Sequence, residues 1–319
     1  IESDGTHVMD IIGMTVRYHR ESKTMTMCMD KAIQKLLKKF NMENCRSVAT
    51  PVMPSMEATE GKENLTFPLR AMVGGLLYVA VMARPDISYA VQRVARCVCS
   101  PTENAIKCGK RILAYLKGTM SQGIHYSPVN ERNFRSVYTK ICREAGKELP
   151  DTVAFGDADF AGCSVTLRST SGSILYHRGT PICWSAKRQT IRATSTCEAE
   201  YCALYDTIKL SLSQGFLDWY GMTGEKIPLT FCDNKSALSV SKSTITTKRS
   251  KHMSLRLHMV RDHCRDLCYV PTGENKADPL TKGLVGEKYL SMFKHAPERV
   301  RTDEEDCVIQ YSRAYFYDL

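Results

Sequence analysis

The sequence lacks the features that would define a membrane or secreted protein. It has no apolar run near the roughly 20 residues that a membrane-spanning helix needs. Its start, IESDGTHVMD, has no basic segment followed by an apolar one, so no secretory signal is expected. It also begins without Met, which indicates a piece of a longer product. We therefore expect an intracellular protein.

Cysteine is frequent, but its spacing is not that of a disulfide framework. The 14 cysteines include no CxxC pair, and their scatter is typical of reduced thiols. One local cluster combines His258, His263, Cys264 and Cys268. Its spacing fits no common zinc module, and we expect a helix running into a strand there.

Positive charge is concentrated in the first half of the chain. The net charge of +10 suits a polyanionic partner. Basic residues exceed acidic ones by eight in residues 1–150 and by two in residues 151–319. An ordinary solvated basic surface would have the same composition, so charge alone identifies no partner.

Hydropathy patterns predict strands and then helices in the first half. Residues 9–29 alternate apolar and polar around a charged stretch at Arg20–Lys23, which predicts a hairpin. Residues 30–40 have helical spacing with Asp30 as the N-cap. Further helices are predicted at 68–82, 86–99 and 103–117. The last has a basic face, which we expect to bind nucleic acid, made of Lys107, Lys110, Arg111 and Lys117.

The second half predicts an α/β domain. Residues 128–151 are polar and aperiodic and indicate a linker. Beyond them the patterns predict strands at 152–155, 172–178, 181–186, 227–232 and 267–271. Helices are predicted at 195–219, from Lys235, at 251–266 and from near Asp278. This order is typical of a mixed sheet with helices packed on it.

Four carboxylates lie where these elements begin or end: Asp157, Glu200, Asp233 and Asp278. Metal-assisted phosphodiester cleavage uses such a set, because hard divalent cations prefer oxygen ligands that separate rigid elements hold in place. Any chain with 34 acidic residues also places some of them near element ends by chance.

Neighbouring acidic residues leave the choice of ligands open. Asp157 and Asp159 alternate along a strand and face the same side, so either could bind a cation. Glu198 and Glu200 differ by about 200° around a helix, so only one of them can face the cations.

Seven sequence blocks follow one another in the second half: GDADFAGC (156–163), RSTSG (168–172), ICWSAKRQT (182–190), STCEAEYCAL (195–204), FCDNKSAL (231–238), SKHMSLRLHMVRD (250–262) and YVPTGENKADPLTKGL (269–284). In this order they closely resemble the ribonuclease H (RNase H) domain of copia-type retrotransposon Pol polyproteins. The resemblance implies that Asp157, Glu200, Asp233 and Asp278 are catalytic and bind two Mg²⁺ ions, which Mn²⁺ could replace. The implied reaction is two-metal hydrolysis of the RNA strand of RNA–DNA hybrids.

The first half resembles the end of the reverse transcriptase of such polyproteins. The matching blocks are IIGMTV (11–16), FNM (40–42), TPV (50–52), GGLLYVAVMARPDISYAV (74–91) and KRILAYLKGT (110–119). The chain has no Asp-Asp pair, so the family's polymerase centre is absent. The implied partners are an RNA–DNA hybrid and the rest of the Pol polyprotein with its upstream polymerase core. The implied location is a cytoplasmic virus-like particle or the nucleus.

We therefore expect a mainly helical α+β remnant of a reverse transcriptase, its palm end and thumb, before an α/β RNase H-like domain with a mixed five-stranded sheet. The expected divisions are 1–130 for the reverse transcriptase part, 131–151 for the linker, 152–290 for the RNase H domain and 291–319 for a tail of unknown role. Ser254 and Leu257 depart from the family pattern. A catalytically inactive nucleic-acid-binding remnant is therefore an alternative, as is an integrase or other nuclease, which the CDN and KADPLTKGL blocks disfavour.

Further polar residues are candidates for contact with nucleic acid. A turn after the first carboxylate strand could hold a phosphate, although its residue types also favour turns by themselves. A strand end could make similar contacts or be simply solvated. The residues of this turn and this strand end are Arg168, Ser169, Thr170 and Ser171, and Lys187 and Arg188.

Overall fold

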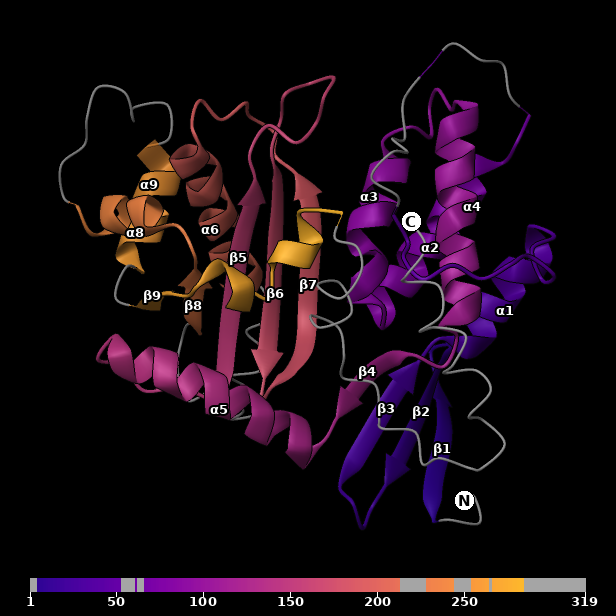
Figure 1. Ribbon diagram of the computed structural model, residues 1–319, viewed down its shortest axis with the longest axis horizontal. Coiled ribbons are helices and arrows are strands. Elements are labelled where there is room, and N and C mark those ends of the chain that lie inside the picture. Colours follow the sequence, from indigo (N-terminus) through magenta and orange to yellow (C-terminus); the bar gives the residue numbers. More distant parts are fainter. Residues whose placement is uncertain are drawn as a thin grey trace, which may run out of the picture.

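Two β-sheets, one in each half of the chain, organise the protein, and helices pack against both (Figure 1). The computed structural model describes residues 5–52, 61, 66–212, 228–243, 254–263 and 266–283. No helix in these ranges has the length and apolar character that crossing a bilayer requires.

The first sheet is antiparallel, with the strand order β1-β2-β3-β4. Its strands are β1 (Thr6–Ile11), β2 (Met14–His19), β3 (Thr24–Cys28) and β4 (Gly123–Tyr126). The predicted hairpin is confirmed, because β2 pairs with β3 and the Lys23 amide donates to the Arg20 carbonyl oxygen at 3.3 Å. A second hairpin, between β1 and β2, was not separated by the sequence pattern.

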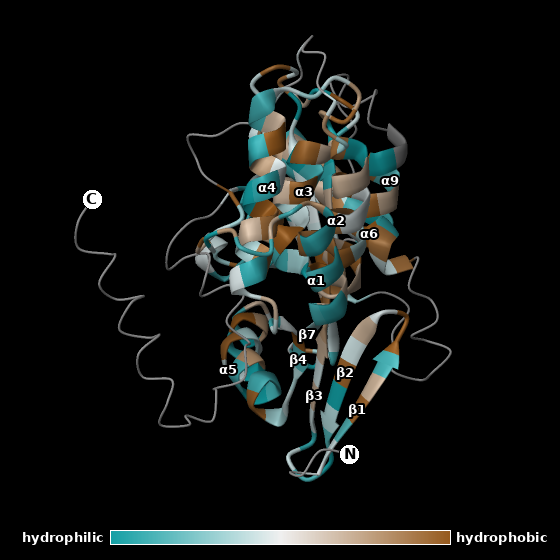
Figure 2. Cartoon of the chain, turned by 90° about the vertical axis from the view of Figure 1, so that its right-hand side faces the viewer, coloured by the Kyte–Doolittle hydropathy of each residue, from teal (hydrophilic) through white to brown (hydrophobic). Residues whose placement is uncertain are grey.

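Four helices of the first half lie toward one end of this sheet, above the strands in Figure 2. They are α1 (Asp30–Lys39), α2 (Leu69–Met82), α3 (Ser88–Ala95), which follows a 3-10 turn η1 (Pro85–Ile87), and α4 (Glu103–Gly118). The predicted helix at 86–99 is therefore shorter than expected. Buried apolar residues of α1, α2 and α4, such as Ile33, Leu76 and Leu113, form the core of this half.

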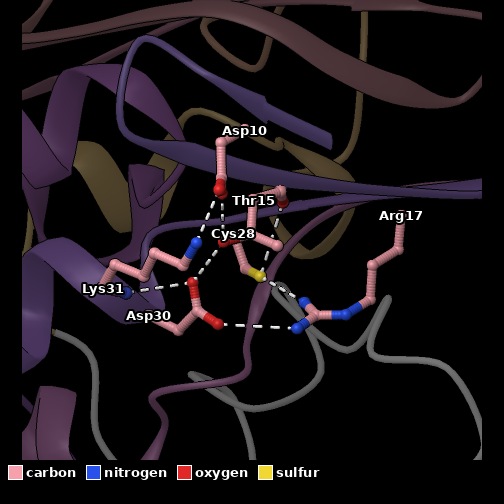
Figure 3. Close-up of polar contacts among 6 residues, drawn as sticks. All are labelled: Asp10, Thr15, Arg17, Cys28, Asp30 and Lys31. Carbon is pink, nitrogen blue, oxygen red and sulfur yellow. Dashed lines mark hydrogen bonds and ion pairs between the residues drawn. The ribbon is translucent and has the colours of Figure 1, made fainter. Parts of the chain in front are cut away.

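A polar network joins the first sheet to α1 (Figure 3). Asp30 Oδ1 accepts a hydrogen bond from Thr15 Oγ1 at 2.7 Å, and Arg17 lies 3.5 Å from Asp30 Oδ2 and 3.0 Å from Cys28 Sγ. The prediction of Asp30 as N-cap is wrong. Met29 is the N-cap and Asp30 is the first helical residue, because its carboxylate is bound by strand side chains as well as by the helix start.

A buried ion pair fixes the start of α3. Arg84 Nη2 lies 2.6 Å from Asp86 Oδ2, and Tyr115 Oη of α4 donates to the same oxygen at 2.7 Å. Both side chains of the pair are almost fully buried. Because each charge has several hydrogen-bond partners, the pair can be kept out of water and holds η1 against α4.

The expected linker at 128–151 is wrong in its first two thirds, since residues Pro128–Glu144 form helix α5. Ser127 Oγ caps the helix by accepting from the Asn130 amide at 3.1 Å. Buried Phe134, Tyr138 and Cys142 recur every four residues, which is a helical period. The polar residues between them hid this stripe from the sequence reading.

The second sheet is mixed and has the order β7-β6-β5-β8-β9. Its strands are β5 (Thr152–Asp159), β6 (Thr170–His177), β7 (Thr180–Arg188), β8 (Leu229–Cys232) and β9 (Leu267–Tyr269). β6 runs antiparallel to β5 and β7, whereas β5, β8 and β9 are parallel. The expected mixed five-stranded sheet with helices is thus present.

Helices cover both faces of this sheet. On one face α5 packs its aromatic side chains on Phe155, and the ring centroids of Phe155 and Tyr138 are 5.2 Å apart. On the other face α6 (Thr196–Leu212) lies close to Gly156, where an added Cβ would be 2.8 Å from Thr207 Oγ1. Two further helices, α8 (Lys235–Lys242) and α9 (Ser254–Asp262), share a core with α6.

The last predicted helix is described only at its start, as the 3-10 turn η5 (Asp278–Leu280) after a similar turn η4 (Thr272–Glu274). The remainder of that helix, the end of the helix expected at 195–219, Cys264 of the cysteine–histidine cluster and the tail at 291–319 lie outside the described residues.

The two halves contact each other along α3 and β7, which run side by side in Figure 1. The Trp184 indole on β7 donates to the Ala80 carbonyl oxygen of α2 at 2.9 Å. Arg96, which caps α3, reaches Thr170 Oγ1 at 3.4 Å. This contact brings the first half next to the end of β7 and to η5.

Candidate active site

Asp157 lies on β5, the central strand of the second sheet, and is 1% exposed. Its partner in the strand pairing is Gly172 of β6, and Phe155, two residues earlier on β5, pairs with Phe231 of β8. Thr281 Oγ1 donates a hydrogen bond to Asp157 Oδ2. The carboxylate is therefore held between the sheet and the segment that follows η5.

Of the two glutamates at the start of α6, Glu200 belongs to the carboxylate group. Glu198 Oε2 accepts hydrogen bonds from the backbone amide and the hydroxyl of Thr194, both at 2.7 Å, and the Glu198 amide donates to Ser195 Oγ at 3.2 Å. This arrangement caps the helix and occupies Glu198. Glu200 is 8% exposed, and the charges of Asp157 and Asp233 act on it.

Asp233 follows β8 directly and is half-buried. One ligand atom each from Glu200, Cys232 and Asp233 lie within 4.8 Å of one another. Asn234 caps α8 by accepting from the Ala237 amide at 2.9 Å, which fixes the backbone immediately after Asp233. The end of β8 and the start of α8 thus position this carboxylate.

Asp278 is fully buried in η5, and a lysine accompanies it. Lys282 Nζ lies 2.8 Å from Asp278 Oδ1 and 4.0 Å from Asp157 Oδ2. The η5 segment is attached to β5 through Asn275, whose Nδ2 donates to the Gly156 carbonyl oxygen at 3.1 Å. The structure therefore brings together all four carboxylates that the sequence analysis selected.

Burial and mutual repulsion raise the pKa of two of these carboxyl groups. Burial is the largest cause for Asp157, and the charges of Asp233 and Asp278 add to it, while Lys282 and Thr281 oppose it; the pKa rises to about 6. Burial, followed by the charges of Asp157 and Asp233, raises the pKa of Glu200 to about 9. Negative charge is costly here unless a cation offsets it.

The donor set fits a hard divalent cation. Glu200 Oε2 is buried and has no hydrogen-bond partner within the described ranges, which leaves it available as a ligand. Carboxylate oxygens are the ligands that Mg²⁺ prefers. The Cys232 thiol is a soft ligand that suits other metals, and burial raises its pKa well above the usual value. The carboxylates rather than the thiol therefore define the site.

Asp159 lies at the edge of this group. Its side chain fills the space beside Gly162, where an added Cβ would lie 1.7 Å from Asp159 Oδ2. Burial is the largest cause of its raised pKa, and the charges of Lys282 and Arg93 lower it. Asp159 is therefore influenced both by Lys282 at the site and by Arg93 of α3 in the first half.

The predicted basic face of α4 divides into two pairs. Lys107 and Lys110 are exposed; Lys107 lies 3.4 Å from Glu103 and Lys110 lies over the Phe67 ring. Arg111 Nη2 donates to Thr50 Oγ1 at 3.1 Å, and Lys117 Nζ donates to the Cys45 carbonyl oxygen at 2.6 Å. The second pair thus binds the loop at 40–52, and only the first pair is freely presented to solvent.

The turn predicted at 168–171 is shorter than expected, because Thr170 and Ser171 begin β6, and the three hydroxyls of this segment are engaged inside the protein. Ser169 Oγ accepts from the Ala161 amide at 3.1 Å, and Ser171 Oγ accepts from Gln189 Nε2 at 3.0 Å. Ser169, Thr170 and Ser171 are all buried. These contacts favour the structural alternative for the three hydroxyls, whereas Arg168, Lys187 and Arg188 retain exposed surface.

Three residues near the carboxylates were missed by the sequence reading: Cys232, Thr281 and Lys282. Lys282 had a usable signal, because it lies four residues after Asp278 and such spacing brings opposite charges together in a helical turn. Thr281 and Cys232 had no such signal, since a threonine or cysteine a few positions from an acidic residue in the sequence has no fixed partner.

Comparison with known proteins identifies the relatives of this chain. It is 31% identical over 293 residues to the Retrovirus-related Pol polyprotein from transposon TNT 1-94 of Nicotiana tabacum, a match that covers 88% of this chain and 21% of that protein. It is 33% identical over 257 residues to the corresponding polyprotein of transposon RE1 of Arabidopsis thaliana, covering 78% and 16%. The chain thus spans about a fifth or less of the length of these relatives.

Over most of its length the chain is similar to copia-type retrotransposon Pol polyproteins, as the sequence blocks indicated. No protein-family model matches it. Among solved structures, the N-terminal RNase H domain of a Mycobacterium tuberculosis protein aligns with a TM-score of 0.32 and 16% identity, covering 41% of this chain and 91% of that one.

Proposed function

We propose that residues 152–283 form an RNase H-type nuclease that hydrolyses the RNA strand of RNA–DNA hybrids. One observation carries the proposal: Asp157, Glu200, Asp233 and Asp278 come from four separate elements and gather at one place. Ligand atoms of Glu200 and Asp233 lie within 4.8 Å of each other, and Lys282 Nζ lies within 4.0 Å of both Asp157 Oδ2 and Asp278 Oδ1. A chance distribution of acidic residues would not bury three carboxylates together, because like charges destabilise one another away from water.

The four carboxylates would hold divalent cations, and Mg²⁺ is the proposed ion, with Mn²⁺ as a substitute. Two such ions would supply an activated water and would neutralise charge on the scissile phosphate. Glu200 Oε2 supports this role, because it is buried and has no hydrogen-bond partner among the described residues. The four carboxylates also carry more negative charge than Lys282, which lies among them, can offset.

The chain's own residues position this site and control its access. Asp157 and Asp278 are buried under Thr281 and Lys282, so their orientation is set by hydrogen bonds rather than by solvent. Asp233 is half-buried and lies nearer to the solvent. We infer that substrate approaches from the side of Asp233, where a phosphate can reach the carboxylate group without disturbing the core.

The proposed substrate is recognised by its backbone. Hybrids are distinguished by groove shape and 2′-hydroxyls more than by base sequence, so sequence preference should be weak. The proposed partners are the hybrid and the remainder of the polyprotein, including its polymerase core. The chain matches only about a fifth of the length of the TNT 1-94 polyprotein, and this supports a function that is shared with other segments of such a polyprotein.

Cleavage of a labelled RNA–DNA hybrid by the full chain, with Mg²⁺ or with EDTA, tests the proposal. Asp157→Asn keeps the size of the side chain but removes a charge that would hold the cations. We expect its cleavage rate to fall at least about a thousandfold, as is typical for loss of a metal ligand. Asp159→Asn is the matched control and should keep most of the activity, because Asp159 lies at the edge of the group.

The results separate an enzyme from a binding remnant. Metal-dependent cleavage that Asp157→Asn abolishes would support the nuclease. Hybrid binding without any metal-dependent cleavage by the unmodified chain would instead support a catalytically inactive nucleic-acid-binding remnant. Equal loss in both variants would show that Asp159 also serves as a ligand.

A further inference from the structure

Arginines of the two halves meet beside the candidate active site, where α3 contacts the ends of β6 and β7. Arg96 Nη2 lies 3.4 Å from Thr170 Oγ1, and Thr170 is paired with Arg188 across β6 and β7. Arg93 lies one turn before Arg96 and acts on the charge of Asp159. The cluster thus extends from the edge of the carboxylate group onto the first half of the chain.

These arginines are held close together although their charges repel. Burial is the largest cause that lowers the pKa of Arg96, and the charges of Arg188 and then Arg93 add to it. Among the described residues, the charges of Cys163 and Tyr89 oppose this shift. A half-buried cluster of like charges is unfavourable by itself and becomes favourable when an anion binds between its members.

Part of the hydrogen-bonding capacity of the cluster is unused. Within the described part of the chain, Arg96 Nε is buried and has no hydrogen-bond partner. The partners of Arg96 Nη2 are the side chains of Gln92, at 2.6 Å, and Thr170, both of them neutral. A guanidinium has a planar fork of donors that matches a phosphate, so an anion with several oxygens suits this site better than a single carbonyl would.

We propose that Arg93, Arg96 and Arg188 form an anion site that binds a backbone phosphate of the nucleic acid strand lying across the carboxylate group. The inference rests on the proposed function for the identity of the ligand. It adds a role for the first half of the chain, since α3 supplies two of the three arginines. The exposed lysines of α4, which the sequence analysis favoured, are then not the nearest basic residues to the site.

Binding of a fluorescently labelled RNA–DNA hybrid, measured by anisotropy in EDTA over a series of salt concentrations, tests the site. Arg93→Gln and Arg96→Gln remove charge but keep a hydrogen-bonding side chain. Each should weaken binding by about tenfold, as expected for one charge-assisted contact. Each should also reduce the slope of log affinity against log salt by about 1.

Arg132→Gln is the matched control, because Arg132 is exposed on α5. That helix lies near Gly179, at the opposite ends of β6 and β7 from Thr170 and Arg188. The hybrid affinity and the salt slope of Arg132→Gln should equal those of the unmodified chain. Arg96→Lys keeps the positive charge but lacks the planar donors of the guanidinium. It should bind the hybrid more weakly while retaining the slope of log affinity against log salt. This variant therefore separates the effect of charge from the role of Arg96 in holding α3 to β6.

Unchanged affinity and slope in the double variant Arg93→Gln/Arg96→Gln would overturn the inference. So would equal weakening by Arg132→Gln, or absence of salt-dependent hybrid binding by the unmodified chain. The cleavage assay keeps the two proposals apart. Arginine-dependent binding without cleavage would reject the nuclease and support the anion site. Cleavage together with arginine-independent binding would support the nuclease and reject the anion site.

Discussion

Lys282 Nζ lies 2.8 Å from Asp278 Oδ1, so the chain itself supplies a cation to the carboxylate group of the candidate active site. The lysine side chain is 40% exposed, whereas the carboxylate that it contacts is fully buried. Lys282 can therefore move toward solvent without disturbing the core, while Asp278 cannot. A divalent cation and this ammonium would compete for the same oxygens.

Replacing Lys282 by Met should destabilise the metal-free protein and strengthen its binding of Mg²⁺. Loss of a hydrogen bond between charged groups costs about 1–3 kcal/mol, and exposure of the lysine favours the lower end of that range. Urea unfolding in EDTA would show this deficit, and Mg²⁺ should reduce it because the ion takes over the charge compensation. Equal deficits with and without Mg²⁺ would contradict competition at this site.

Gly172→Ala should disrupt the position of η5. An added Cβ would lie 2.7 Å from Thr281 Cγ2, 2.8 Å from the Ala277 carbonyl oxygen and 2.9 Å from Leu280 Cβ. Overpacking of this kind costs about 1–3 kcal/mol of unfolding free energy, and hybrid cleavage should fall because Thr281 and Asp278 move with the turn.

The matched control is Gly74→Ala in α2, since a Cβ there meets nothing within 4 Å. That change should raise stability by about 0.5–1 kcal/mol, because alanine restricts the unfolded chain and favours the helix. Thermal unfolding and cleavage assays on the two variants would be compared. Normal cleavage by Gly172→Ala would show that the site tolerates a shift of η5.

Tyr138 should contribute to stability through both its ring and its hydroxyl. The ring packs against Phe155 and Phe231, and Oη donates to the Glu274 carbonyl oxygen at 2.6 Å. Tyr138→Phe should cost about 1 kcal/mol for the lost hydrogen bond, and Tyr138→Ala about 3–5 kcal/mol for the cavity. Val137→Ala, on the exposed side of α5, should change stability by less than about 0.5 kcal/mol in the same urea titrations.

The basic residues of α4 should differ in what their loss affects. Lys107→Met and Lys110→Met together should leave stability unchanged within about 0.5 kcal/mol, because both side chains are exposed. Lys117→Met should lower stability by about 1 kcal/mol, since it loses the hydrogen bond to the Cys45 carbonyl oxygen. Thermal unfolding measures both effects, and equal behaviour of the two variants would contradict the division of this helix face.

The element order of the second half could be predicted because its strands are buried and bounded by turn residues. The four carboxylates could be selected because their sequence blocks match those of the family, and the structure brings them together. The choice between Glu198 and Glu200 could not be made from spacing alone. It depends on the hydrogen bonds of Glu198 to Thr194, which only the folded helix start defines.

Long-range contacts account for most of what the sequence did not predict. Helix α5 is an exception with a local cause, because its apolar stripe is a single row of three residues among polar neighbours. The arginines of α3 drew no attention, since their importance comes from Thr170 and Arg188, which lie more than 70 positions away. Sequence patterns report local periodicity, whereas such partners depend on how the two halves pack.

The hydrogen bond from the Trp184 indole to the Ala80 carbonyl oxygen gives the protein an internal optical reporter of its own assembly. An indole whose N–H is satisfied by a backbone carbonyl in a half-buried place becomes hydrated when that partner leaves. Separation of α2 from β7 would therefore shift the emission of Trp184 to longer wavelength, even if both sheets stayed folded. With only two tryptophans in the chain, a variant that retains Trp184 alone would let this separation be followed apart from global unfolding.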